Sequence, residues 1–266
     1  MRRSSFDSDT TSQQHRGNPQ GDAAIVTKSA APSPFLLLGD HAGRVIPPRL
    51  RRLGLREPAL SRHIAWDIGV AGLGERLSVA LNATFIAQRF SRLVIDCNRD
   101  PARADSIPEM SDGTIVPANQ ALAAAEREAR ISQIFAPYHA RITEELDARA
   151  AREQSTIVVA LHSFTPTMQG FARPWRFGVL HLGASNYSNA VLARLRTEPG
   201  ELQVGDNEPY RMDDVDFTVP HHAIARGLDY LELEVRQDLI ADAAGQESVA
   251  DLLARVLPAA LEDGMI

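Results

Sequence analysis

Two histidines follow apolar segments at positions where their side chains could bind a divalent metal ion. His41 comes shortly after Phe35–Leu38, and His162 comes directly after Ile157–Leu161. Two histidines and one carboxylate that leave a fourth coordination position open are the usual composition of a hydrolytic zinc site. The chain has a single cysteine, Cys97, so an internal disulfide and a cysteine-rich zinc cluster are both excluded.

The carboxylate of such a site could come from Asp67 or from Asp40. If residues 39–41 continue a strand, Asp40 and His41 point to opposite faces of the sheet. Asp40 could then orient a histidine without touching the metal. Asp67 precedes a predicted helix, where a carboxylate could equally serve as the N-terminal cap. We expect Asp67 to be the ligand, with Asp40 as the alternative.

A polar turn after a third apolar segment could bind a substrate. It contains Asp96, Asn98 and Arg99. The planar guanidinium of Arg99 could bind a substrate carboxylate through two parallel hydrogen bonds. The alternative is an ion pair of Arg99 with Asp96 or Asp100 that stabilises the turn. His222 lies in a predicted loop, and only its position near the last predicted strand suggests a role in binding.

Alternating strands and helices would bring these residues together. Strands are predicted at 35–38, 84–87, 93–95, 157–161, 177–182 and 230–235, and helices at 66–82, 118–153, 189–196 and 249–261. Residues 198–219 read as a surface loop, and Pro137 predicts a kink or break in the long helix. We therefore expect a single α/β domain of the phosphorylase/hydrolase-like kind, with a mostly parallel central sheet flanked by helices. Ligands of such sheets bind beyond the carboxyl ends of the strands.

The first part of the chain is polar and poor in large apolar side chains. Such a segment cannot bury enough apolar surface to offset the entropy of ordering it. We therefore expect residues 1–33 to be a disordered or loosely attached leader, with the domain at 34–266. The alternative is a strand through Ala24–Val26 added at a sheet edge.

Composition excludes several classes of function. The 266 residues include 28 Lys+Arg and 34 Asp+Glu, a net charge of −6, which argues against sequence-independent binding of nucleic acid. No apolar run approaches the roughly 20 residues that span a bilayer, and no secretory signal is apparent, so we expect a cytoplasmic protein without a membrane partner. Lys28 is the only lysine, which disfavours Schiff-base chemistry.

Six segments together carry a more specific signal. They are Gly39–Pro47, His63–Gly69, Ser91–Arg99, Leu161–Phe164, Gly205–Tyr210 and Leu233–Arg236. In combination they resemble the N-formylglutamate amidohydrolase family, and the resemblance spans about residues 35–257. Members are similar, more distantly, to the zinc carboxypeptidases, whose catalytic glutamate lies two residues before an arginine on a late strand.

Two departures from these patterns concern the first motif. The carboxypeptidases have a glutamate three residues after the first histidine, where this chain has Arg44. The best-described deformylases of the family begin the loop with Pro-His-Ser-Gly, whereas residues 40–43 here are Asp-His-Ala-Gly. Metal chemistry therefore transfers to this chain better than substrate identity does.

The resemblance implies metal-dependent hydrolysis of an N-acyl, in particular N-formyl, amino acid such as N-formylglutamate, with release of formate and the amino acid. It implies one Zn²⁺ per chain held by His41, Asp67 and His162, with Glu234 as general acid and base. Arg99 or Arg236 would stabilise the oxyanion and the other would bind the substrate carboxylate. Arg92, Asn98 and His222 complete the predicted substrate-binding residues. The alternative is a non-catalytic module of the same fold that binds an acidic amino acid through Arg92, Arg99 and Arg236 without tightly bound metal.

Overall fold

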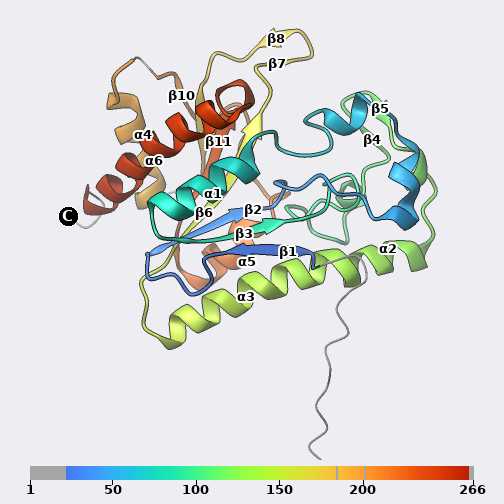
Figure 1. The fold of residues 1–266 in the computed structure, drawn as a ribbon, viewed down its shortest axis with the longest axis horizontal. Helices are drawn as coiled ribbons and strands as arrows, with labels where there is room; N and C mark the ends of the chain where they lie inside the picture. Colours follow the sequence, from blue (N-terminus) through green and yellow to red (C-terminus); the bar gives the residue numbers. More distant parts are fainter. Residues whose placement is uncertain (1–21, 184, 201, 264–266) are drawn as a thin grey trace, which may run out of the picture.

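The computed structural model describes residues 22–183, 185–200 and 202–263 and is built around a seven-stranded sheet (Figure 1). Its strands are, in spatial order, β1 (Ala24–Thr27), β3 (Thr84–Gln88), β2 (Phe35–Gly39), β6 (Ile157–Phe164), β11 (Asp229–Arg236), β9 (Phe177–Leu180) and β10 (Val204–Asp206). The four central strands β3, β2, β6 and β11 are parallel to one another. β1 and β9 run antiparallel to β3 and β11, and β10 is parallel to β9.

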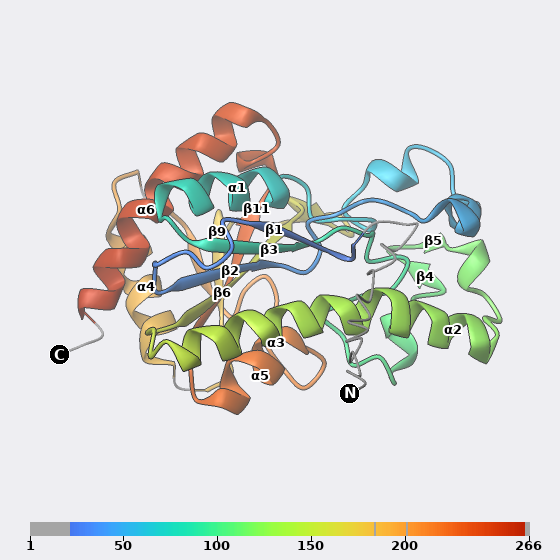
Figure 2. The same ribbon diagram turned by 60° about the horizontal axis from the view of Figure 1, so that its bottom comes forward.

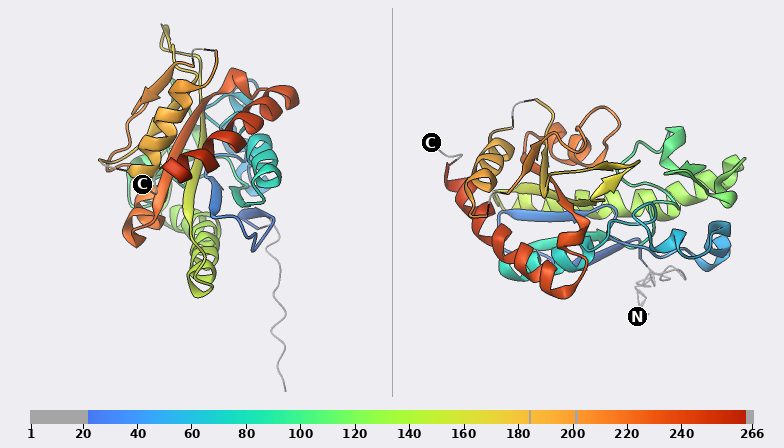
Figure 3. Two further views of the ribbon diagram at one scale, coloured as in Figure 1. Left: turned by 90° about the vertical axis from the view of Figure 1, so that its left-hand side faces the viewer. Right: turned by 90° about the horizontal axis from the view of Figure 1, so that it is seen from above.

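Helices cover both faces of the sheet (Figures 2 and 3). One face carries α1 (Val70–Ala80), α4 (Asn186–Thr197) and α6 (Ala243–Asp263), and the other carries α3 (Ala136–Ala151) and α5 (Thr218–His222). Because alternate residues of a strand point to opposite faces, Leu37 and Val159 pack under the first group, whereas Leu38 and Val158 pack under the second. The predicted α/β fold with a mostly parallel sheet between helices is confirmed.

Smaller elements build the loops between the main strands and helices, most of them at the carboxyl ends of the central strands. They are the hairpins β4 (Met110–Ser111) with β5 (Thr114–Ile115) and β7 (Thr167–Met168) with β8 (Phe171–Ala172), the helix α2 (Ala124–Arg130), and short helical turns at Pro48–Gly54, Ala59–Ser61, Ala104–Ser106, Pro117–Asn119, Ile224–Arg226 and Gln237–Leu239. None of the helices in the described ranges is long and apolar enough to cross a bilayer.

The prediction of a leader over residues 1–33 is wrong for the part that the structure describes. β1 pairs with β3 from Ala24 opposite Gln88 to Thr27 opposite Phe85, as the edge-strand alternative expected. Val26 packs against the core on the α3 face, so the strand both pairs with β3 and buries apolar surface. Residues 1–21 lie outside the described residues.

The predicted strand at 93–95 is also wrong. Leu93, Val94 and Ile95 are buried, but they lie in a turn between the sheet and its loops. Side chains satisfy the carbonyl groups that a neighbouring strand would otherwise bind: Asn119 donates to the carbonyl of Leu93 (2.9 Å), and Arg130 donates to that of Val94 (2.9 Å). These three apolar residues are therefore buried without joining the sheet. The predicted loop 198–219 likewise contains the edge strand β10.

The predicted break at Pro137 takes a specific form. α2 continues through a π-helical turn, Ile131–Phe135, directly into α3, which has Pro137 in its first turn. Proline lacks the N–H of a normal helical bond, and a π-helical turn is a common way to accommodate such an interruption. The helix thus continues past the proline, and α3 covers the central strands.

Candidate metal centre

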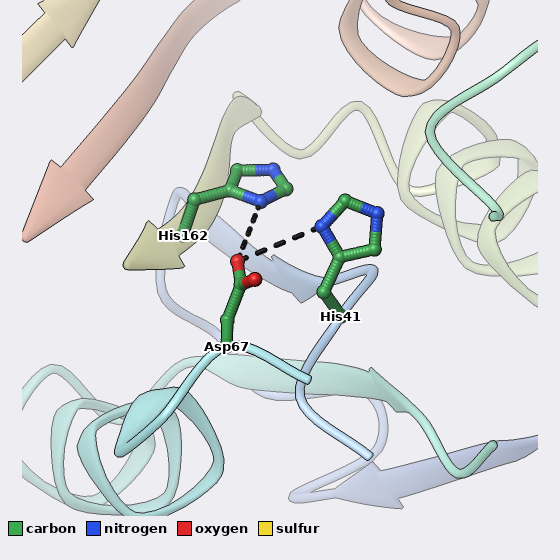
Figure 4. Close-up of side chains that lie close together, drawn as sticks. All are labelled: His41, Asp67 and His162. Atoms are coloured by element: carbon green, nitrogen blue, oxygen red, sulfur yellow. Dashed lines mark hydrogen bonds and ion pairs between the residues drawn. The ribbon is translucent and has the colours of Figure 1, made fainter. Parts of the chain in front are cut away.

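Three side chains meet beyond the carboxyl ends of β2 and β6 (Figure 4). His41 follows β2, His162 lies on β6, and Asp67 lies in the segment that leads into α1. The backbone N–H of Asp67 donates to the carbonyl of His41 (2.9 Å), so two of the three segments are joined directly. One possible ligand atom from each residue lies within 4.8 Å of the others, and all three side chains are buried.

The facing atoms of this cluster fit a divalent metal ion. Oδ2 of Asp67 lies 3.0 Å from Nδ1 of His162 and 3.6 Å from Nδ1 of His41. Nδ1 of His41 is buried and has no hydrogen-bond partner among the described residues. Two imidazole nitrogens and one carboxylate oxygen directed at one point are a donor set that suits Zn²⁺ and leaves a further position open.

Two further carboxylates lie behind the histidines, on the side away from Asp67. Nε2 of His41 is 2.7 Å from Oδ1 of Asp96, and Nε2 of His162 is 3.6 Å from Oδ2 of Asp40. A carboxylate at Nε2 favours the tautomer in which Nε2 carries the proton and Nδ1 offers its lone pair. The hydroxyl of Tyr138 in turn donates to Oδ1 of Asp40 (2.8 Å). The structure thus places Asp67 inside the cluster, and Asp40 behind His162 at a distance too long for a hydrogen bond.

The cluster strongly favours positive charge. Burial alone would lower the pKa of His162, but hydrogen bonding to Asp67 and the charges of neighbouring carboxylates raise it to about 10. The pKa of His41 is also raised. Burial and the charge of Arg92 would lower it, but Asp96 and Asp67 outweigh these two effects. Burial would raise the pKa of Asp67, yet the two histidines and Arg92 hold it well below its usual value. The same excess of negative charge would stabilise a cation between the three side chains.

The cluster opens into a cavity of about 560 Å³. Seven of the nine residues predicted for the site line it: His41, Asp67, Arg92, Asn98, Arg99, His162 and Glu234. The cavity is therefore formed by the turns after β2 and β6, by β11 and by the loops around residues 92–112 and 210–216. This is the edge of the sheet at which the sequence predicted a ligand.

Glu234 is the buried carboxylate closest in register to the histidines. It lies on β11 opposite His162 of β6, and its Oε2 has no hydrogen-bond partner among the described residues. Burial raises the pKa of Glu234 to about 7. A carboxyl group with this pKa can both accept and release a proton near neutral pH, as general acid and base catalysis requires.

Two of the arginines in the cavity wall, Arg92 and Arg99, are held by different partners. Arg92 donates to Oδ2 of Asp96 through Nε and Nη2 (3.1 and 2.7 Å) and lies 3.4 Å from Oδ1 of Asp67. Arg99 donates to Asp216 (3.1 Å). Its ion-pair partner is thus neither of the two aspartates that the local sequence suggested, but one far along the chain.

Asn98 ties two walls of the cavity together. Its Oδ1 accepts hydrogen bonds from the backbone N–H groups of Phe217 and Thr218 (3.0 and 2.9 Å), and its Nδ2 donates to Asp216 (3.2 Å). The amide was predicted to bind substrate. Its hydrogen-bonding groups instead connect the turn after Asp96 to the segment before α5.

Two predicted substrate-binding residues lie away from the cavity. Arg236 pairs with Asp238 (2.8 Å). His222 is buried beneath α3, where its Nε2 lies 2.9 Å from Nδ1 of His139 and the two rings stack at 5.1 Å. Both expectations are corrected: neither the place of Arg236 at the end of β11 nor the nearness of His222 to this strand brings the side chain to the cavity.

Sequence reasoning missed other lining residues, among them Tyr210, His63, Asp216 and Glu232. Tyr210 ends Gly205–Tyr210, one of the six segments that carry the family resemblance. Its hydroxyl accepts a hydrogen bond from the buried Arg173 (3.0 Å), and the guanidinium of Arg173 also stacks on the tyrosine ring. For Glu232 the signal was its spacing of two from Glu234, which places both on one face of a strand. Nothing in the sequence around Asp216 distinguishes it from other loop aspartates.

Comparisons with known proteins agree with this geometry. A family model described as N-formylglutamate amidohydrolase matches residues 33–241. The structure of gene product Atu2144 from Agrobacterium tumefaciens is similar with a TM-score of 0.88 and 38% sequence identity, over 92% of this chain and 96% of that one. An N-formylglutamate amidohydrolase from Ralstonia eutropha JMP134 is similar in fold, with a TM-score of 0.61 and 20% identity over 91% of this chain and 98% of that one. A comparison with curated protein sequences finds no significant match.

Proposed function

The chain belongs to the N-formylglutamate amidohydrolase family, and from this premise we propose that it is a zinc-dependent hydrolase of N-acyl, in particular N-formyl, amino acids. The observation that carries the proposal is the convergence of two Nδ1 atoms and one carboxylate oxygen at the edge of a cavity that also contains an unpaired glutamate. One zinc ion per chain, held by His41, Asp67 and His162, would act as a Lewis acid that polarises the amide carbonyl and makes water more acidic.

Glu234 moves the protons of the reaction. Its carboxylate takes a proton from water as the water oxygen bonds to the carbonyl carbon, and it then delivers that proton to the nitrogen as the carbon–nitrogen bond breaks. The products are a carboxylic acid, formate for an N-formyl substrate, and a free amine. The pKa of Glu234, raised by burial to about 7, suits both steps.

Two arginines assist this chemistry from the cavity wall. Arg92 lies beside Asp67 and Asp96, so its guanidinium is the one suited to donate to the oxygen of the polarised carbonyl. Arg99 lies farther along the wall, beside Asp216, and would bind the carboxylate of the amino acid. This assignment replaces the predicted use of Arg236, which does not line the cavity.

Metal analysis of the purified chain tests the proposal, with His162→Ala as the key variant. We expect about one zinc per chain in the wild type, loss of that zinc in the variant, and release of free amine from N-formyl or N-acetyl amino acids by the wild type alone. His181→Ala is the matched control, because His181 pairs with Asp206 at the surface of the sheet edge. Wild-type protein that neither contains nor binds zinc, or a His162→Ala variant that keeps full activity, would overturn the mechanism and leave a metal-free binding module as the better account.

A further inference from the structure

The cavity contains a second buried glutamate that the proposed chemistry does not use. Glu232 lies on β11 two residues before Glu234, so both side chains point to the same face and Glu232 lies about 7 Å deeper along the strand. It is 2% exposed, and its Oε2 has no hydrogen-bond partner among the described residues. A buried carboxyl oxygen without a partner costs free energy, and is therefore a group for which a partner from outside should be sought.

The positive group that acts most strongly on Glu232 is His162, whose Nδ1 is directed at Asp67. As a metal ligand this histidine would be neutral. Burial, together with the acidic side chains of Asp216, Glu234 and Asp40, raises the pKa of Glu232 to about 8, so a cation bound beside it would favour its charged form.

The whole cavity has the same imbalance. Eight carboxyl groups line it, against three arginines: Asp67, Asp96, Asp105, Asp112, Asp213, Asp216, Glu232 and Glu234, with Arg92, Arg99 and Arg211. Arginine side chains pair with Asp67, Asp96, Asp105, Asp112 and Asp216, which leaves Glu232 and Glu234 as the buried carboxyl groups of the cavity without an arginine partner among the described residues. N-formylglutamate would bring two further carboxylates into this field, whereas a substrate with a cationic side chain would be attracted by it.

We propose that Glu232 selects the substrate: its carboxylate binds a cationic group on the amino-acid side chain, so the enzyme acts on N-acyl derivatives of basic amino acids such as lysine. This inference rests on the proposed function, because it assumes that the amide lies beside the metal ligands and Glu234. The depth of Glu232 below Glu234 is a distance that the four-carbon stem of lysine can span. Arg99 remains available for the single carboxylate of such a substrate.

Three N-formyl amino acids separate this inference from its alternatives. Nα-formyl-L-lysine carries a cationic side chain, Nα-formyl-L-norleucine an uncharged chain of similar length, and Nα-formyl-L-glutamate an anionic one. We expect the wild type to prefer the lysine over the norleucine derivative by about tenfold or more in kcat/KM, because the buried carboxylate is left unpaired by the uncharged chain. Glu232→Gln should lower this ratio about tenfold. Asp105→Asn, which removes a carboxylate from the exposed rim, should leave the ratio within about twofold.

Several outcomes would overturn the inference. The first is a wild type that prefers the glutamate derivative. The second is a Glu232→Gln variant that loses activity equally on all three substrates while its zinc content is unchanged. Calorimetry measures the affinity of the wild type and of Glu232→Gln for Nα-formyl-L-lysine. Together with turnover, this affinity tells whether the cation site, the hydrolase activity or both are rejected. Turnover without a preference for lysine rejects the inference alone. Binding that depends on Glu232 without any turnover rejects the hydrolase and supports the cation site, and neither binding nor turnover rejects both.

Discussion

Each histidine of the candidate metal centre has a carboxylate on either side, and this arrangement gives the two ring nitrogens different tasks. In His41, Nδ1 faces Asp67, and Nε2 is held by Asp96 at 2.7 Å. Asp96 also binds the guanidinium of Arg92 at 2.7 Å. One carboxylate therefore orients both a metal ligand and the arginine assigned to the substrate carbonyl.

Asp96→Asn tests this double role. The amide cannot provide the same negative charge to His41 and Arg92, so we expect the dissociation constant for Zn²⁺ to rise about 10- to 100-fold. Competition with a chromophoric chelator measures it. Asp238→Asn, which removes a surface partner of Arg236, should leave the constant unchanged. Equal zinc affinity in Asp96→Asn and the wild type would contradict the orienting role of Asp96.

Glu234→Gln tests the proton transfer independently of the metal. The amide keeps the size of the side chain and cannot accept the proton of water, so kcat should fall by about 10² or more. Zinc content should remain near that of the wild type, because Glu234 is not one of the three clustered ligands. Glu144→Gln, at an exposed position of α3, is the matched control. Turnover near the wild-type rate in Glu234→Gln would remove this residue from the mechanism.

Between elements, the contact of α3 with α5 depends on two neutral histidines. Burial lowers the pKa of His139 and of His222 to about 3. The charge of His222 lowers the pKa of His139 further, and the charges of His221 and Arg226 lower that of His222 further. In the unfolded chain both would bind protons near pH 6.5. Between pH 6.5 and about 3 the unfolded state therefore binds more protons than the folded state, and stability falls as the pH falls.

Denaturant unfolding at several pH values measures this effect. Each histidine can contribute a slope of up to about 1.4 kcal/mol per pH unit in that window. His222→Gln should reduce the slope, whereas His221→Gln, at the exposed neighbouring position, should not. Identical slopes in the two variants would show that the buried pair does not set the acid sensitivity.

The elements that position the site could be predicted where the apolar pattern of a segment agrees with the structure that the segment adopts in the fold. β6 and β11 have continuous apolar or strictly alternating residues, and His162 was predicted at the end of β6 on that basis, whereas the role of Glu234 was implied by the family resemblance. Leu93–Ile95 has the same local pattern, but Asn119 and Arg130 satisfy its carbonyl groups, and partners so distant in sequence leave no local trace. The partner of Arg99, Asp216, escaped prediction for the same reason.

On the scale of the whole molecule, the three side chains of the candidate metal centre come from separate parts of the chain. A ligand that binds the folded state alone stabilises it by an amount that grows with its concentration relative to the dissociation constant, about 2.7 kcal/mol at a hundredfold excess. We therefore expect a chelator to lower the thermal midpoint of the wild type and added Zn²⁺ to restore it. His162→Ala should melt at one temperature in both conditions, and His181→Ala should behave as the wild type does. A wild type whose thermal midpoint does not change with chelator would contradict the stabilisation of the fold by bound zinc.

The pairing of β6 with β11 also has a consequence for how the protein folds. The two strands are parallel neighbours over their whole length, from Ile157 opposite Asp229 to Phe164 opposite Arg236, although α4 and the long loops lie between them in the sequence. Closing so large a loop costs entropy before any contact rewards it, which slows the search for the native topology. His41 follows β2, which pairs with β6 from Phe35 opposite Ile157, a still larger separation in the sequence. The three candidate ligands therefore come together only when the central sheet has formed. A metal ion should therefore enter a molecule that is already folded, and should lengthen the lifetime of the native state rather than speed its formation.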